Sequence, residues 1–248
     1  MVSKEFDNVV EAPSLGIRMK AWLQLLKFRL TFVVTFSGGM GYMLGATKNI
    51  DTLHFILFIL GGFLMTVSAN VINQIIEKDS DRLMKRTSGR PLPTGVISVS
   101  EAMTFALVTG IVGFAILLFY TNTLAALLTL FSTIMYGFAY TPLKRINPVA
   151  VLVGAIPGAL PPLIGWVAIT GEFQILGFLL FGIQFIWQFP HFWAIAWVLD
   201  DDYKKAGIRL LPGNGAKDIN TAFQIMIYTL MLIPLGLIPA KLGYTGIN

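Results

Sequence analysis

The stretch LHFILFILGGFLMTVSANVINQIIEKDSDR, residues 53–82, decides the fold of this chain. Its first part, residues 53–76, is an apolar run without Lys, Arg, Asp or Glu. As a helix it is long enough to cross the hydrocarbon of a bilayer, which takes about 20 residues. Acidic residues follow at once, at Glu77, Asp79 and Asp81. The stretch therefore predicts a membrane-spanning helix with a group of carboxylates at one end.

The composition extends this prediction to the whole chain. Of its 248 residues, 55% are hydrophobic and only 12% are charged, and the mean hydropathy is +0.73. A soluble domain carries about a quarter charged residues. The expected fold class is therefore all-α, a multi-span transmembrane helix bundle. Seven runs are long and apolar enough to span a membrane, at approximately 28–46, 53–76, 99–120, 122–141, 148–170, 173–198 and 220–240.

The basic residues predict the orientation of these spans. Of the 18 lysines and arginines, all but Lys48 and Lys241 precede or open the first span or lie in the second, fourth and sixth links. Because cytoplasmic loops are enriched in Lys and Arg, the N-terminal tail, residues 1–20, is expected in the cytoplasm. The acidic links 77–98 and 199–219 are then on the same side. The net charge of +5 thus reflects topology, and nucleic acid is not expected as a partner.

Cysteine and histidine usage excludes several kinds of site. The chain has no cysteine, which excludes a disulfide scaffold, a thiolate metal site and a cysteine nucleophile. Its two histidines, His54 and His191, are too few for a histidine metal cage. We interpret His54 as an interfacial residue without a role.

Asn73, Glu77 and Asp81 follow one another at intervals of four residues. On a helix, steps of four advance by about 40°, so these three side chains share one face and Asp79 points away. Mg²⁺ prefers oxygen ligands, usually a couple of carboxylates completed by waters and substrate phosphates. The three residues are therefore candidate catalytic and metal-binding residues. The alternative is a solvated helix end whose carboxylates pair with the basic residues beside them.

A second acidic cluster, the aspartates 200–202, follows the apolar span 173–198. The polar side chains Gln184, Gln188 and His191 of this span fall within roughly 60° of one another on a helix. A continued helix brings Asp202 onto the same stripe. Because polar residues inside a membrane mark functional sites by default, His191 and Asp202 are favoured as functional. For the two glutamines, hydrogen bonding between helices is an equal alternative.

Basic residues follow both acidic clusters. Arginine makes bidentate contacts with phosphate oxygens, and lysine acts as a point charge. With a divalent cation, such residues stabilise the charge that develops on a departing diphosphate. The two clusters therefore predict a cation site that holds a diphosphate beside a cavity in the membrane. Topology alone also places basic residues here, and we interpret the dipeptide Lys144-Arg145 as a topology signal.

Several segments resemble a known family. Asn73, Glu77 and Asp81, followed by RLMKRTSGRPLPTG from Arg82, resemble the first aspartate-rich motif of the UbiA-type intramembrane prenyltransferases. Further segments resemble one branch, the protohaem IX farnesyltransferases or haem O synthases, and the likeness covers about residues 22–240. They are RPLP from Arg90, YTPLKR from Tyr140, GAIPGALPPLIGWVAITG from Gly154, PHFWAIAW from Pro190 and DYKKAGIRLLP from Asp202.

The resemblance implies a bundle of nine spans around a central cavity that opens to the cytoplasm. It implies Mg²⁺-dependent transfer of a farnesyl group from farnesyl diphosphate to a vinyl group of haem b (protohaem IX), which gives haem O. It also implies a prokaryotic plasma membrane, with haem A synthase or terminal-oxidase assembly as partners. Residues 21–248 are then expected to form a single intramembrane domain that lacks the last two helices.

The resemblance implies roles for individual residues as well. Asn73, Glu77 and Asp81 match the first metal–diphosphate motif, with Glu77 where the family usually has aspartate, and Asp202 matches the second. His191 is a candidate haem contact. The other candidate substrate-binding residues are Arg86, Arg90 and Lys204, as diphosphate contacts, and Gln188.

Three other functions stay open at this point. One is prenyl transfer to an aromatic ring such as a quinone precursor. Another is a membrane transporter whose carboxylates line the transport path. The acidic residues cluster at one membrane edge and no ionisable series continues to the other, which disfavours a transporter. The third is a non-catalytic protein that binds haem or an assembly partner.

Overall fold

The computed structural model describes residues 14–46, 50–213 and 215–244, and it contains helices and no strand within these residues. The expected all-α, multi-span fold is confirmed. In the described part, six helices are long and apolar enough to cross a membrane. They are α3 (Thr52–Ile76), α6 (Val99–Tyr120), α7 with its continuation (Thr123–Leu143), α9 (Ala150–Thr170), α10 (Ile175–Val198) and α12 (Ile219–Lys241).

The seventh expected span is helix α2 (Phe28–Gly45), which does not reach the apolarity of the other six. Arg29 and four glycines lower its mean hydropathy. It nevertheless lies inside the bundle, packed against α3 and α9. The predicted count of seven apolar spans is therefore corrected to six, with α2 as a less apolar helix held by its neighbours.

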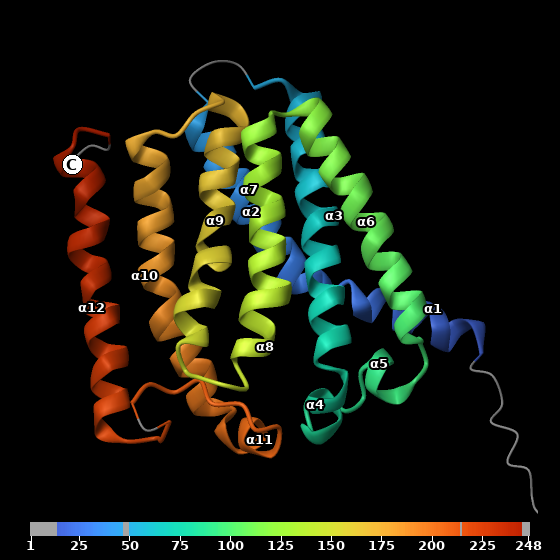
Figure 1. Ribbon diagram of the computed structural model, residues 1–248. Helices are drawn as coiled ribbons and strands as arrows, with labels where there is room; N and C mark the ends of the chain where they lie inside the picture. The colour runs from blue at the N-terminus through green and yellow to red at the C-terminus, as the bar shows by residue number, and fades with distance from the viewer. Residues whose placement is uncertain (1–13, 47–49, 214, 245–248) are drawn as a thin grey trace, which may run out of the picture.

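The helices stand side by side in one bundle (Figure 1). Across the view the order is α12, α10, α9, α7, α3 and α6, with α2 behind α7 and α9. Helix α9 is central, since it packs against α2, α7 and α10. It remains helical through Pro157, Pro161 and Pro162, which its neighbours in the bundle accommodate.

The backbones of α2 and α9 are in direct contact. A Cβ atom on Gly41 would lie 2.0 Å from the carbonyl oxygen of Pro162, and one on Gly165 would lie 1.9 Å from that of Gly38. Only glycine fits at these two positions. In a bilayer the hydrophobic effect does not drive helices together, so they associate through close van der Waals packing, which small residues allow.

The two acidic links lie at the same end of the bundle, as the charge pattern predicts (Figure 1). We call this end the loop end. It carries α4 (Lys78–Leu83), α5 (Pro91–Thr94), α8 (Thr141–Leu143) and α11 (Asp200–Lys205), and α1 (Leu15–Leu25) lies beside it. Of the expected tail, residues 1–13 lie outside the described residues and residues 15–20 belong to α1.

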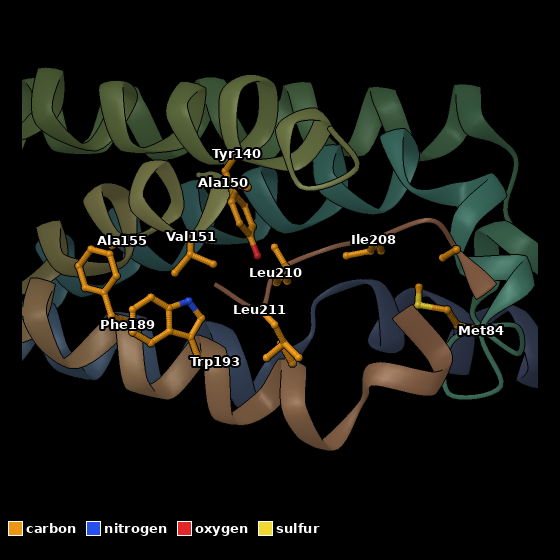
Figure 2. Packing of buried hydrophobic residues seen from close by; sticks show 12 residues of the cluster. Met84, Tyr140, Ala150, Val151, Ala155, Phe189, Trp193, Ile208, Leu210 and Leu211 are labelled. Carbon is orange, nitrogen blue, oxygen red and sulfur yellow. The ribbon is translucent and has the colours of Figure 1, made fainter. Parts of the chain in front are cut away.

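A buried hydrophobic cluster packs both acidic links against helices α9 and α10. Figure 2 shows Phe189 and Trp193 of α10 facing Val151 and Ala155 of α9. Met84 from the first acidic link and Ile208, Leu210 and Leu211 from the second belong to the same cluster. This shared core fixes the two acidic links relative to each other.

Candidate active site

A cavity of about 530 Å³ lies at the loop end. Its walls come from the junction of α1 and α2, from the end of α3, from the first acidic link, from the end of the α7 segment and from α11. The polar and charged side chains among its lining residues are Gln24, Lys27, Arg29, Asn73, Glu77, Asp81, Arg86, Arg90, Tyr136, Tyr140, Lys144 and Tyr203.

The first acidic motif keeps its spacing although its helix breaks. Helix α3 ends at Ile76, and Glu77, with φ −91° and ψ 0°, separates it from α4. The amide of Glu77 still donates to the carbonyl of Asn73 (3.0 Å), and that of Asp81 to the carbonyl of Glu77 (2.7 Å). Asn73, Glu77 and Asp81 all line the cavity, and Asp79 is exposed beside Arg82.

These three residues are buried, with whole-residue exposed fractions of 2% for Asn73, 5% for Glu77 and 1% for Asp81. The alternative of a solvated helix end is therefore excluded. Their partners come from other segments. Lys144 forms an ion pair with Glu77, Arg90 Nη1 lies 2.6 Å from Asp81 Oδ2, and Lys27 Nζ donates to Asn73 Oδ1 at 2.9 Å.

Lys27 was not predicted as a site residue. It caps α2 in the left-handed region, at φ 44° and ψ 50°, the only non-glycine residue with positive φ in the described part of the chain. Such a conformation costs of order 1–3 kcal/mol and is typical of functional sites. Burial, and next the nearby charge of Arg90, lowers the pKa of the Lys27 ammonium to about 7. An anion in the cavity would favour its charged form.

The cavity has an excess of basic side chains. Lys27, Arg29, Arg86, Arg90 and Lys144 line it, against the carboxylates of Glu77 and Asp81. Arginine and lysine in a partly desolvated setting bind phosphate oxygens strongly. The arrangement therefore fits a polyanion such as a diphosphate.

The donor set also fits a hard divalent cation. Asp81 Oδ1 is buried and has no hydrogen-bond partner among the residues that the structure describes. A buried carboxylate oxygen in this state is unfavourable unless a cation or donor compensates it. Among the described residues no three His, Cys, Asp or Glu side chains group as a metal site. A cation here would need the Asn73 amide oxygen and ligand phosphates besides Glu77 and Asp81, which is the mixed oxygen set that Mg²⁺ takes.

Asp202 contacts the first acidic link, but it does so from a separate short helix and not from a continuation of α10. Helix α10 ends at Val198 and Asp202 belongs to α11, so the polar stripe of α10 does not continue to it. Its carboxylate accepts from the backbone N–H groups of Lys85 (3.4 Å) and Arg86 (3.3 Å) and pairs with Lys205. Burial opposes ionisation, but these contacts outweigh it and hold the pKa of Asp202 below its usual range.

Three other candidates lie outside the cavity lining. Lys204 is largely exposed and pairs with Asp200 at 2.7 Å. Gln188 Nε2 donates to the carbonyl of Gly158 in α9 at 3.2 Å, which is the hydrogen bond between helices left open above. His191 stacks on Trp187, with ring centroids 4.3 Å apart. The structure thus brings five of the nine predicted residues into the cavity and leaves Asp202, Lys204, Gln188 and His191 outside its lining.

A π-helical turn forms one wall that the sequence did not reveal. Helix α7 (Thr123–Ile134) continues as η1 (Met135–Tyr140), a π-helix, and such turns are frequent at functional sites. Tyr136 and Tyr140 of η1 line the cavity. Gly154 makes room for Tyr140, since a Cβ there would lie 2.6 Å from its ring. The ring of Tyr140 lies against Phe192, and Phe192 lies against His191. These aromatic contacts connect the cavity wall with α10.

Comparisons with known proteins agree with this geometry. The chain is 54% identical over 231 residues to the protoheme IX farnesyltransferase of Cytophaga hutchinsonii, covering 93% of this chain and 81% of that protein. It is 46% identical over 225 residues to the protoheme IX farnesyltransferase of Flavobacterium psychrophilum, covering 90% and 74%.

Solved structures share the fold. A UbiA homolog from Archaeoglobus fulgidus bound to GPP and Mg²⁺ is 25% identical, with a TM-score of 0.67 over 90% of this chain and 76% of that one. A digeranylgeranylglyceryl phosphate synthase, 23% identical, reaches a TM-score of 0.75 over 93% and 80%. The UbiA prenyltransferase family matches residues 32–247. The chain therefore belongs to the UbiA prenyltransferase family, and it is a prenyltransferase that spans the membrane several times.

Proposed function

We propose that this prenyltransferase transfers a farnesyl group from farnesyl diphosphate to a vinyl group of haem b and so makes haem O. The observation that carries the proposal is the cavity at the loop end, where Asn73, Glu77 and Asp81 lie among basic side chains. The name of the close relatives supports haem b as the acceptor. The GPP and Mg²⁺ bound to the A. fulgidus homolog support a prenyl diphosphate as the donor.

Asn73, Glu77 and Asp81, joined by Asp202, would hold Mg²⁺. When bound, Mg²⁺ neutralises diphosphate oxygens and so makes the diphosphate a better leaving group. Arg86 and Arg90 would contact the diphosphate, and Lys27 and Lys144 join them because both line the cavity. We do not retain Lys204 in this role, because its ammonium pairs with Asp200 and is exposed.

The reaction conserves atoms and electrons as follows. The bond between C1 of the farnesyl group and the diphosphate oxygen breaks, and its electron pair leaves with the diphosphate. The vinyl π electrons of haem b form the new carbon–carbon bond to C1. Water then adds to the cation left on the haem side chain and releases a proton, which gives a hydroxyethylfarnesyl group. The basic side chains of the cavity stabilise the charge on the departing diphosphate.

His191 is the residue we propose for haem contact. Its ring stacks on that of Trp187 and lies against that of Phe192, which in turn lies against Tyr140 of the cavity wall, so a series of aromatic rings connects the cavity wall with His191. Gln188 lies one turn away, but its amide is engaged by Gly158, so any part in haem binding is indirect.

The proposal includes a location. The basic residues of the loop end support a cytoplasmic position for this end and for the N-terminus, with the spans in the plasma membrane of a bacterium. Haem O made here would pass to haem A synthase or to the assembly of a terminal oxidase.

The test is product analysis with purified protein. Haem b, farnesyl diphosphate and Mg²⁺ are incubated with the protein in a bilayer mimic, and the haem is analysed by mass spectrometry. We expect haem O, with formation lost in EDTA and restored by Mg²⁺. Absence of farnesylated haem, while the C. hutchinsonii relative produces it in parallel, would overturn the proposal. Prenylation of a quinone precursor instead would identify an aromatic acceptor, and solute flux without prenyl diphosphate would identify a transporter.

A further inference from the structure

A buried threonine hydroxyl next to the cavity-lining Tyr140 contacts one of the proposed metal ligands. Thr141 follows η1 directly and is 1% exposed. Its Oγ1 donates to the carbonyl of Tyr136 at 2.7 Å and accepts from Asn73 Nδ2 at 3.1 Å. Because both Thr141 and Asn73 are buried, water does not replace this contact.

The π-helical turn makes the contact available. In an α-helix a threonine hydroxyl bonds a carbonyl three or four residues earlier, as Thr129 does with Ala125 at 2.8 Å. The partner of Thr141 lies five residues earlier, across the widened turn. The Thr141 oxygen therefore meets α3, where Asn73 lies.

The hydrogen bonds fix which way the Asn73 amide points. A hydroxyl has one proton, and that of Thr141 is used on Tyr136, so its oxygen can only accept from Asn73. The Asn73 NH₂ group must then face Thr141 and the amide oxygen must face away from it. On that other side Lys27 Nζ donates to Asn73 Oδ1 at 2.9 Å. The contact with Lys27, which lines the cavity, agrees with the orientation that Thr141 requires.

We infer that Thr141 is a positioning residue, which holds the Asn73 amide with its oxygen toward the cation site. This inference rests on the proposed function, in particular on the magnesium site. Without the Thr141 acceptor, the amide could turn its NH₂ group toward the cavity, where it repels a cation. Partners of metal ligands in the second layer typically contribute 10–100-fold in metal affinity.

The test compares three variants of the full chain in detergent. Thr141→Val keeps the shape and removes the acceptor, and Thr141→Ser keeps the hydroxyl. Thr129→Val is the matched control, since Thr129 is buried in the same helix and its hydroxyl serves only the Ala125 carbonyl among the described residues. The probe is Mn²⁺, which favours the same oxygen ligands as Mg²⁺, titrated with inorganic pyrophosphate and followed by electron paramagnetic resonance.

We expect Thr141→Val to raise the Mn²⁺ dissociation constant about tenfold or more, with Thr141→Ser and Thr129→Val within about twofold of the unchanged protein. Thermal unfolding and elution profiles identify folded samples. Equal Mn²⁺ affinity for Thr141→Val and the unchanged protein would overturn the inference and leave the proposed function standing. Thr141→Ser as weak as Thr141→Val would also overturn it. An unchanged protein that binds no Mn²⁺ would instead remove the magnesium site itself, and the inference with it.

Discussion

The ammonium of Lys144, just after α8, forms an ion pair with the carboxylate of Glu77 at the end of α3. Both side chains are nearly buried, with exposed fractions of 12% and 6%. A buried pair adds little net stability, but removal of one partner leaves an uncompensated charge, which costs about 3–5 kcal/mol. The effect of the pair on the free energy of unfolding can therefore be separated from its effect on catalysis.

The variant Lys144→Met should lower the free energy of unfolding by about 3 kcal/mol and should weaken prenyl transfer, because the cavity loses a cation. Adding Glu77→Gln to it should restore most of the stability, since no buried charge is then unpaired, but should not restore activity. Denaturation in detergent and turnover measure the two effects. A double variant no more stable than Lys144→Met would contradict the pairing.

Asp81→Asn should reduce turnover at least about 100-fold while the protein stays folded, because a carboxylate ligand and the Arg90 partner are lost together. Asp79→Asn is the matched control. Asp79 is exposed in the same short helix, and among the described residues its carboxylate forms an ion pair only with Arg82, so its loss should leave turnover unchanged.

Asp202→Asn should also abolish turnover, because it removes the charge of a proposed magnesium ligand and weakens the hold of its carboxylate on the backbone of Lys85 and Arg86. Steady-state rates over a range of Mg²⁺ concentrations test this. Near-normal turnover at low Mg²⁺ would exclude Asp202 from the site.

His191→Ala should raise the KM for haem up to about tenfold, since one aromatic stacking contact contributes about 0.5–1.5 kcal/mol. The KM for farnesyl diphosphate should not change. Phe178→Ala, which removes a stacked ring far from the loop end of the same helix, serves as the control. An unchanged KM for haem in the His191 variant would remove this residue from the haem site.

Gly165→Ala should destabilise the protein by more than the 1–3 kcal/mol typical of overpacking, because its Cβ would meet a backbone carbonyl of α2 and not a mobile side chain. Gly62→Ala in α3 is the comparison, since nothing lies within 4 Å of its Cβ position. It should be neutral or slightly stabilising, because alanine favours helix. Unfolding temperatures in detergent that rank the two variants equally would contradict the contact between α2 and α9.

Hydropathy predicted most of the fold because membrane thickness sets the length of each helix. The span expected at 99–120 is α6, and a capping box between Ser98 and Glu101 fixes its start. Helix α2 was the exception. Its glycines lower its apolarity, and its place in the bundle depends on contact with α9, which no local pattern encodes.

The site was predicted only where local spacing determines it. Asn73, Glu77 and Asp81 keep their register across the break at Glu77, so the four-residue interval was a sufficient signal. Lys27 and Lys144 meet these residues through tertiary packing. The segment YTPLKR, which contains Tyr140 and Lys144, was the available signal, but charge alone did not distinguish a ligand from a topology residue. The prediction that Asp202 continues the polar stripe of α10 required an unbroken helix, but α10 ends before Leu199 and Asp202 lies in α11.

The chain supplies its own counter-ions for the two carboxylates at the centre of the site, through Lys144 and Arg90, and a lysine donor, Lys27, for the Asn73 amide oxygen. We therefore expect the enzyme to fold in the bilayer without bound metal, unlike a zinc finger, whose folding depends on its ion. Stripping divalent ions with a chelator should leave the melting temperature unchanged. Mg²⁺ with pyrophosphate should raise stability only by mass action, about 2.7 kcal/mol at 100 times the dissociation constant. A protein that melts earlier in chelator would show that these internal cations are insufficient.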